Sequence, residues 1–482
     1  MARPTADRNV RPPPDVELVE IAEYLASPLA ACAEAYATAR LCLLDALACG
    51  LLALRYPECT RHLGPLVPGT FVPGGARVPG TPHVLDPVKA AFDIGAMVRW
   101  LDFNDTFLAA EWGHPSDNLG AILAVSDWLS RRKAAAAEPP ITVRDVLAAL
   151  IQAYEVQGVL ALGNAFNRVG LDHVLLVKVA STGVAARLLG ATRAQTVDAL
   201  SQAWVDGHSL RTYRHAPNTC SRKSWAAGDA TSRGVRLALM TMAGEPGMPS
   251  ALSAPRWGFC DALLHGARLV KERPYGSYVV ENVLFKVSYP AEFHAQTAVE
   301  CAVALHPAVR GRLDHVERVE IATQEPALGI ISKAGPLHNP ADRDHCLQYM
   351  VAVALLHGDL AADCYQDEFA RDPRIDALRD RMTVREGPRF TAEYYDPEKR
   401  AIGNSVQVFF DDGTATEKRT VEYPMGHRRR RAEALPLLDR KLRDALESRF
   451  APARAEAIYA LCMDAEGLAA TPVHELVDWL AT

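Results

Sequence analysis

The chain has 482 residues, and its 52 lysines and arginines against 58 aspartates and glutamates give a formal net charge of −6. Hydrophobic residues make up 49% and charged residues 23%, an ordinary globular composition that excludes wholesale disorder. The slight excess of acid disfavours general binding to nucleic acid or anionic membranes. At roughly 100–200 residues per domain, the length allows about two to four domains.

Residues 1–14 are rich in arginine and proline, and we expect them to form a disordered arm. Helical spacing of apolar residues then dominates, interrupted by a Pro/Gly-rich loop over residues 64–87. The predicted helices cover residues 18–25, 35–54, 88–99, 118–132, 142–158, 177–189, 193–204, 232–243 and 298–305. So much consecutive helix excludes a βαβ fold.

The sequence changes character near residue 275. Residues 316–321 alternate as a strand does, and residues 405–410 and 418–423 flank a Gly-bearing turn, which predicts a β-hairpin. Helix returns from residue 428. The sequence therefore predicts a mainly α protein with an inserted α+β domain. A large all-helical domain would use both chain ends (15–274 and 425–482), and a smaller α+β lid domain would cover 275–424.

Ten cysteines are scattered along the chain without any C-x-x-C pair. This spacing gives no support to zinc ribbons or iron–sulfur clusters, so we expect no metal. Dispersed cysteines are typical of a reducing compartment, and the N-terminus lacks the apolar stretch of a signal peptide. The longest apolar run, residues 41–54, is shorter than the roughly 20 residues of a membrane span, and we expect its Asp45 to be a paired buried carboxylate. We therefore predict a cytoplasmic protein with no membrane or nucleic-acid partner.

Two segments combine carboxylates, hydroxyls and imidazoles. The first is a loop between two predicted helices, where such groups could either transfer protons or cap the following helix. It carries Asp102, Asp105, Thr106 and His114. The second carries His173 ahead of an apolar helix, a position where a lone histidine more often has a structural role.

Two further segments are rich in cations and aromatics. Arg214, Arg222 and Lys223 precede a helix, where they could bind an anion or simply remain solvated. The other segment contains Lys286, Glu292 and His294, and residues near 345 add a histidine and a tyrosine. These groups can all move protons. Neither segment has a Walker lysine, a G-x-G-x-x-G turn or a G-x-S-x-G elbow.

Long strings in these segments carry a more specific signal, among them RWLDFNDTFLAAEWGHPSDNLG, GLDHVLLVKVASTG, RHAPNTCSRKSWAAGDATSR and NPADRDHCLQYMVAVALL. They closely resemble the MmgE/PrpD family, and the similarity runs from about residue 16 to the C-terminus. The resemblance implies a lyase without cofactors that removes water from 2-methylcitrate to give 2-methyl-cis-aconitate, in the methylcitrate cycle of propionate breakdown. It also implies a homodimer. Alternatives on the same scaffold are decarboxylation of cis-aconitate, epimerisation of a related dicarboxylate, or non-catalytic tricarboxylate binding.

The family's cis-aconitate decarboxylase implies which residues line the cleft, through its D-x-x-D-T and H-x-x-Q-Y motifs, two histidines and a lysine ahead of a helix. The resemblance implies catalytic roles for Asp102, His114, His173, Lys223, His294 and Tyr349. It implies substrate contacts for Asp105, Thr106, Arg214, Arg222, Lys286, Glu292 and His345. Either Glu292 or His294 could face the substrate. A substrate with three carboxylates needs fixed cations, a base (His114, His173 or His294) and an acid (Tyr349 or a histidine).

Overall fold

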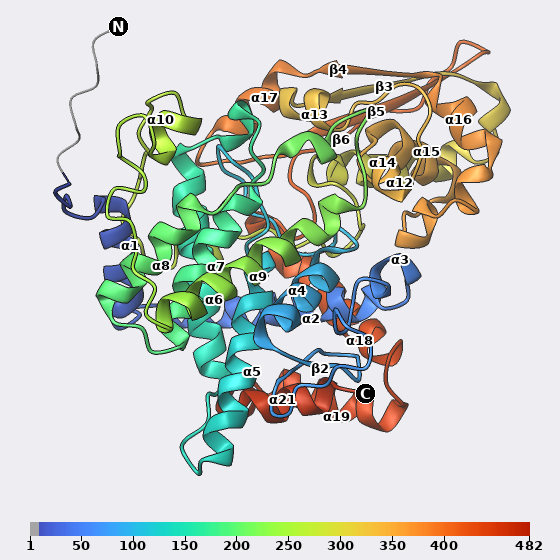
Figure 1. The fold of residues 1–482 in the computed structure, drawn as a ribbon. Helices are drawn as coiled ribbons and strands as arrows, with labels where there is room; N and C mark the ends of the chain where they lie inside the picture. The colour runs from blue at the N-terminus through green and yellow to red at the C-terminus, as the bar shows by residue number, and fades with distance from the viewer. Residues whose placement is uncertain (1–8) are drawn as a thin grey trace, which may run out of the picture.

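The computed structural model describes residues 9–482 and is mainly helical (Figure 1). Residues 9–14 of the predicted arm are exposed and have no regular secondary structure, and residues 1–8 lie outside the described residues. The amino-terminal half contains α1 (Val16–Ala26), α2 (Ala33–Ala53), α3 (Pro57–Thr60), α4 (Pro87–Arg99), α5 (Leu119–Ala135), α6 (Val143–Gly163), α7 (Val174–Leu188), α8 (Arg193–Val205), α9 (Arg222–Met242), α10 (Phe259–Leu263) and α11 (Tyr278–Glu281).

Each helix predicted in this part is present, but α9 begins ten residues before the predicted start at residue 232. Its first turns carry Arg222, Lys223 and Asp229, so the apolar spacing that reveals the helix begins only later. The predicted Pro/Gly-rich loop contains two short antiparallel strands, β1 (Ala76–Arg77) and β2 (Val84–Leu85).

A larger hydrophobic core joins helices from both chain ends. Its buried residues lie between 18 and 287 and again between 434 and 480. The carboxyl-terminal helices are α18 (Arg431–Glu447), α19 (Pro452–Met463), α20 (Ala465–Ala470) and α21 (Val473–Leu480). Because α18 packs against α2 and α21 against α5, the carboxyl-terminal helices lie beside helices of the amino-terminal part (Figure 1).

Two helices of the larger core, α2 and α6, are long and apolar enough to cross a membrane. Within the fold, however, 72% of the most apolar window of α2 and 89% of that of α6 are buried. Asp45 of α2 pairs with Lys441 of α18 at 2.7 Å, as expected for a buried carboxylate. Both helices thus serve as core helices here.

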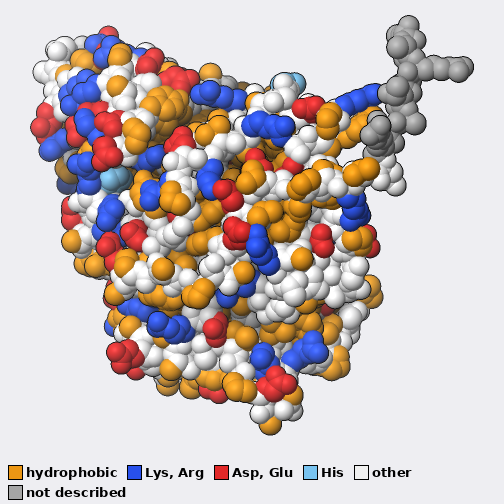
Figure 2. All heavy atoms as spheres, turned by 90° about the vertical axis from the view of Figure 1, so that its left-hand side faces the viewer, with side chains coloured by type: hydrophobic (Ala, Val, Ile, Leu, Met, Phe, Trp, Pro, Cys, Tyr) orange, Lys and Arg blue, Asp and Glu red, His pale blue; other side chains and the backbone are white. Residues whose placement is uncertain are grey.

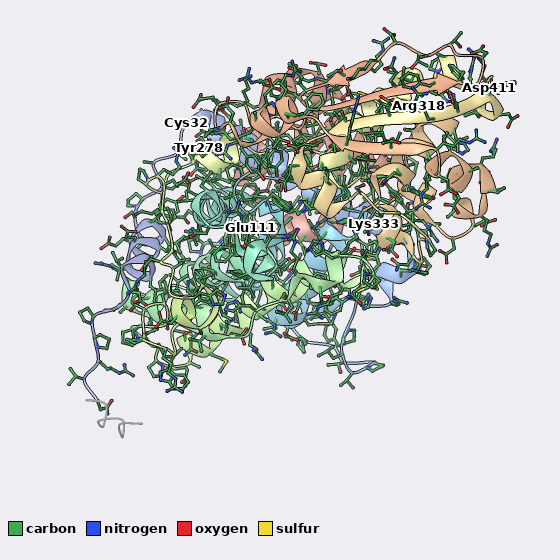
Figure 3. All side chains as sticks on the ribbon, turned by 90° about the horizontal axis from the view of Figure 1, so that it is seen from above. Cys32, Glu111, Tyr278, Arg318, Lys333 and Asp411 are labelled. Atoms are coloured by element: carbon green, nitrogen blue, oxygen red, sulfur yellow. The ribbon has the colours of Figure 1, made fainter. Side chains whose placement is uncertain are left out.

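A smaller hydrophobic core has its buried residues between 291 and 410. It packs α12 (Gln296–Val309) against a sheet of order β4–β3–β5–β6, and α15 (Leu347–His357) packs against α12. Figure 3 views it from above, with Arg318 and Asp411 at one end of the sheet. The other helices of this part are α13 (Glu325–Ile330), α14 (Pro340–Arg343), α16 (Pro373–Arg379) and α17 (Pro388–Tyr395).

In this sheet β3 (Val316–Thr323) is central, and it pairs in parallel with β4 (Met382–Glu386) and antiparallel with β5 (Asn404–Phe410). The predicted hairpin is present as β5 and β6 (Arg419–Val421). β4 was not predicted, because its alternation comprises only two apolar residues, Met382 and Val384, which is too short a pattern to stand out.

The two cores meet near residue 290. Val279, Val283 and Phe285 still pack in the larger core, whereas Ala291 belongs to the smaller one. The composition therefore changes about fifteen residues before the packing does. On the face drawn in Figure 2, basic and acidic side chains are interspersed and do not gather in a patch of one sign.

Candidate active site

A buried carboxylate, Asp102, lies just past the end of α4 and is surrounded by cations. Its Oδ1 lies 2.7 Å from Arg99 Nη1 and contacts Lys286 Nζ, and its Oδ2 lies 3.6 Å from Lys223 Nζ. Burial would raise the pKa of Asp102, but the charges of Arg99, Lys286 and Lys223 outweigh it and hold that pKa well below its usual range. One ionised carboxylate is therefore paired with three cations. We call these four residues, with His114 and His345, the Asp102 cluster.

The backbone at Asp102 has a φ of +48°, in the left-handed region that residues other than glycine rarely adopt. The carbonyl of Asp102 accepts a hydrogen bond from Lys286 Nζ at 2.9 Å. Lys286 thus holds both the main chain and the side chain of this residue. Backbone strain of this kind is found most often at functional sites.

His114 lies beside Asp102, and His173 lies next to His114 with the two ring centroids 5.7 Å apart. His114 Nδ1 lies 2.7 Å from the carbonyl oxygen of Asp105, which can only accept, so Nδ1 carries the proton and Nε2 is the free basic nitrogen. His114 Nε2 faces Asp102 Oδ1 at 4.0 Å. Burial lowers the pKa of both imidazoles, and the charge of Arg99 lowers that of His114 further. Both rings are therefore neutral and able to accept a proton.

Lys223, at the start of α9, connects the Asp102 cluster to the smaller core. Its Nζ lies 2.8 Å from Asp344 Oδ2, and Asp344 Oδ1 accepts from Nδ1 of His345 at 2.7 Å. His345 Nε2 in turn lies 3.9 Å from Asp102 Oδ2. Burial and the charge of Lys223 lower the pKa of His345, so its ring is neutral. Side chains from both cores thus converge on Asp102.

Glu292 and His294 form a pair at the edge of this site. The Nδ1 of His294 donates to Glu292 Oε1 at 2.9 Å, so its Nε2 accepts from the Tyr394 hydroxyl at 3.1 Å. Both ring nitrogens of His294 are therefore occupied. Burial would raise the pKa of Glu292, but the adjacent His294, which also donates a hydrogen bond to it, lowers that pKa to about 2. Glu292 is thus the member of the pair whose charge reaches the Asp102 cluster.

Asp105 and Thr106 hold His114 rather than line an open space. Asp105 accepts from the Ser116 hydroxyl at 2.7 Å and from the Tyr154 hydroxyl at 2.5 Å. Thr106 Oγ1 lies 3.2 Å from His114 Nδ1. Burial raises the pKa of Asp105 to about 7.

Three of the expected residues lie apart from the Asp102 cluster. Arg214 is engaged by Asp172 through two hydrogen bonds of 2.5 and 3.2 Å. The side chain of Arg222 is 37% exposed and pairs with Asp229. The hydroxyl of Tyr349 donates to the carbonyl of Cys364 at 2.6 Å, because the ring packs in the smaller core.

Arg99 and Asp344 are central to the geometry but absent from the expected set. Both stand within the strings that carry the family resemblance, three residues before Asp102 and one before His345. The only sign in the sequence that they belong to the site is that each lies close to an expected site residue. The sequence alone could not show what either side chain contacts.

Polar atoms without a hydrogen-bond partner gather here. Within residues 9–482, they include Asp102 Oδ2, Arg99 Nε and both ring nitrogens of His173. Buried polar groups in folded proteins are nearly always hydrogen-bonded, so such a concentration indicates a site built to receive a polar ligand.

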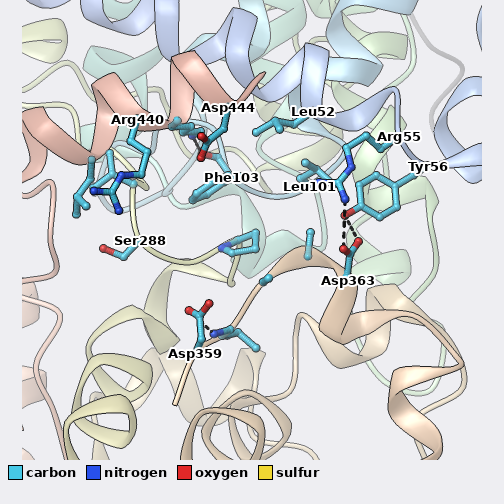
Figure 4. Close-up of a pocket in the computed structure, with 17 residues that line it drawn as sticks. Leu52, Arg55, Tyr56, Leu101, Phe103, Ser288, Asp359, Asp363, Arg440 and Asp444 are labelled. Atoms are coloured by element: carbon cyan, nitrogen blue, oxygen red, sulfur yellow. Dashed lines mark hydrogen bonds and ion pairs between the residues drawn. The ribbon is translucent and has the colours of Figure 1, made fainter. Parts of the chain in front are cut away.

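A cavity of about 480 Å³ adjoins the chain on either side of this site (Figure 4). It is lined by Leu101 and Phe103, which flank Asp102, by Val287 and Ser288, which follow Lys286, and by residues 359–363 of the smaller core. Lys441 lies between the cavity, which it lines, and the Asp102 cluster, because its Nζ donates to the carbonyls of Phe103 and Lys286. At the edge of this cavity, the side chains of Tyr56 and Arg55 donate hydrogen bonds to Asp363.

Two family models match this chain, the MmgE/PrpD N-terminal domain over residues 19–272 and the MmgE/PrpD C-terminal domain over residues 289–465. The chain belongs to the MmgE/PrpD family. The seam between the two family domains falls at residues 273–288, close to where the larger core gives way to the smaller one.

Relatives in this family match over nearly their whole length. A 2-methylcitrate dehydratase of Salmonella typhimurium is 58% identical over 98% of this chain and 99% of its own. A protein of the same name from Cupriavidus necator is 59% identical over 98% of each chain. A mitochondrial 2-methylcitrate dehydratase of Yarrowia lipolytica is 57% identical over 94% of this chain and 88% of its own.

Proposed function

We propose that this MmgE/PrpD protein is a hydro-lyase that removes water from 2-methylcitrate to give 2-methyl-cis-aconitate. The observation that carries the proposal is the Asp102 cluster, where three cations and neutral imidazoles converge with unsatisfied polar atoms in one buried place. The names of relatives 58–59% identical over 98% of the chain support this choice of substrate. In this proposal the chain's own side chains supply the acid and the base, without a cofactor.

The reaction begins at a carbon beside a carboxylate, whose proton is only weakly acidic because negative charge develops on that carboxylate. Arg99, Lys223 and Lys286 are fixed by burial and can stabilise this charge. A single well-placed donor of this kind contributes about 3–4 kcal/mol to the transition state. We assign substrate carboxylates to these cations, with Glu292 and His345 at the edge of the site.

His114 is the base in this proposal. Its proton-bearing Nδ1 is fixed by Asp105 and Thr106, so its Nε2 lone pair points toward Asp102, where the substrate would bind. His173 lies beside it and is the alternative base. His294 has a different role, since both of its nitrogens already have partners, and we infer that it orients Glu292.

We further propose that the smaller core forms a lid domain over the larger helical one. Lys223 and Asp344 come from opposite sides of the boundary, so the site is complete only when the two parts are together. The cavity in Figure 4 lies along the same boundary and is the inferred route by which substrate enters.

A homodimer and a cytoplasmic location complete the proposal. Leu66, Val67 and Phe71 of the Pro/Gly-rich loop are largely exposed, which leaves apolar surface for a second copy to cover. All ten cysteines are free, in keeping with a reducing compartment. Light scattering after gel filtration measures the mass in solution, and a monomer would contradict the first point.

The experiment that tests the function is a product assay. With 2-methylcitrate, absorbance in the ultraviolet should rise as the conjugated double bond forms, and mass spectrometry should show loss of one water. Release of carbon dioxide from cis-aconitate would instead identify a decarboxylase, and conversion between stereoisomers without mass change an epimerase. Binding without turnover of either acid would identify a non-catalytic relative.

A further inference from the structure

A second tyrosine, Tyr365, ends a short 3-10 turn, Ala362–Tyr365, after α15. Its ring packs against that of Tyr349, with centroids 6.2 Å apart. The residue is 4% exposed, yet its hydroxyl has no hydrogen-bond partner within residues 9–482. Leaving such a buried group unsatisfied is unfavourable, so a partner that arrives from outside is the simplest explanation.

The surroundings of Tyr365 place the residue beside the active site. Its carbonyl is held by Arg343, the neighbour of Asp344, at 2.7 Å. The residues just before it, 359–363, line the cavity opposite Leu101 and Phe103, on either side of Asp102 (Figure 4). Burial, and then the charges of Asp344 and Asp102 among the nearby groups, raise the pKa of this phenol well above its usual range. Tyr365 therefore stays protonated throughout the neutral range.

We propose that Tyr365 is the catalytic acid that protonates the departing hydroxyl, and that Tyr349 is a positioning residue. Tyr349 donates to the carbonyl of Cys364, the residue directly before Tyr365, and its ring supports the ring of Tyr365. The inference rests on the proposed dehydration. It adds an acid to that reaction at a position that none of the expected site residues occupies.

The base takes the proton from the methyl-bearing carbon, and the released electron pair forms the carbon–carbon double bond. The carbon–oxygen bond of the adjacent carbon breaks, and its oxygen leaves with the electron pair while taking the phenolic proton of Tyr365, so that water departs. Hydroxide is a far stronger base than a phenolate, so a phenol can make this transfer. Exchange with water returns the base's proton to Tyr365 as product leaves.

The test compares Tyr365→Phe with Tyr349→Phe and with Tyr459→Phe, a distant control in α19. Removing an acid should lower kcat of Tyr365→Phe on 2-methylcitrate about 100- to 1,000-fold. Its melting temperature should stay equal or rise, because the lost hydroxyl had no partner. Tyr349→Phe should melt lower, because it loses a satisfied hydrogen bond, and should lose less than 10-fold in kcat. Tyr459→Phe should keep wild-type turnover.

Binding of tricarballylate, which has three carboxylates but no hydroxyl to expel, separates acid catalysis from site shaping. Its dissociation constant should be the same for wild type and Tyr365→Phe. A weaker affinity, or a wild-type kcat in Tyr365→Phe, would overturn the proposal. Should that variant not fold, 3-fluorotyrosine at position 365 keeps the shape but makes the phenol more acidic, and an unchanged kcat would count equally against it. Wild-type protein without any turnover would instead remove the proposed function itself.

Discussion

Two buried ionic groups lie close together in the fold and differ in how their charges are matched. Lys441 pairs with one carboxylate, Asp45, and donates its other protons to the carbonyls of Phe103 and Lys286. Asp102, in contrast, draws three cations onto one carboxylate. The first arrangement stabilises a fold, whereas the second leaves charge available to a ligand.

The difference teaches that burial of charge does not identify an active site. Both groups are almost fully buried, and both join distant parts of the chain. What distinguishes the Asp102 cluster is the convergence of three cations on one carboxylate, together with a left-handed backbone. Four experiments test this contrast.

The largest effect is expected for His114→Gln, which removes the proposed base. We expect kcat to fall about 1,000-fold, because general base catalysis typically contributes 10²–10⁴-fold. Turnover is measured by the ultraviolet assay, and circular dichroism checks the fold. His315→Gln, an exposed histidine at the far end of the sheet, is the control and should be unaffected. Wild-type kcat in His114→Gln would transfer the role to His173.

Lysine substitutions in the two groups should have opposite signatures. Lys286→Met should lower kcat/KM about 100-fold, because it removes a cation from the reacting carboxylate. Lys441→Met should instead lower the free energy of unfolding by about 3–5 kcal/mol, since Asp45 would stay buried without its cation. Urea denaturation and turnover are measured on both. Adding Asp45→Asn to Lys441→Met should recover most of the stability, and failure to do so would contradict the structural role of the pair.

A smaller effect concerns the pH dependence of stability. Asp105 has a pKa of about 7 in the folded protein and an ordinary value near 3.8 when unfolded. Its contribution to stability is complete below the unfolded value and is lost as the pH rises through 7. Between pH 4 and 7, wild type should therefore lose up to about 1.4 kcal/mol per pH unit relative to Asp105→Asn. Urea titrations at each pH measure this difference, and Asp411→Asn, an exposed carboxylate, should keep the wild-type slope. Parallel curves for wild type and Asp105→Asn would refute the assignment.

The smallest change is expected on treatment with a chelator. Dialysis against EDTA should leave turnover within twofold of the untreated protein, because the proposed acid and base are side chains. Metal content is measured alongside activity. Loss of activity that returns only when a metal is added would overturn the cofactor-free mechanism.

Much of the helical architecture was predictable from the sequence, because a buried helix face repeats its apolar residues with a period that the chain itself displays. The strand β3 and the hairpin that follows were predictable for the same reason, with period two. The edge strand β4 was not, since its apolar positions, Met382 and Val384, are too few to show a period. The early start of α9 was also hidden, because Arg222 and Lys223 precede its apolar positions.

For the candidate site, the sequence indicated which strings carry polar side chains and which family they resemble. It could not say that Arg214 is engaged by Asp172, that Tyr349 is hydrogen-bonded to Cys364, or that the Tyr365 hydroxyl has no partner among residues 9–482. Hydrogen-bond partners are chosen among residues that are up to hundreds of positions apart, as Lys223 and Asp344 illustrate.

Periodicity, composition and long family-like segments can be recognised in the sequence alone. They were enough to predict the class of fold, the family and which ionisable groups are present. The tertiary structure alone decided which of those groups are satisfied and which are left open. That decision belongs to packing, since burial removes water as a partner, and a polar atom must then be met by another part of the protein or by a ligand.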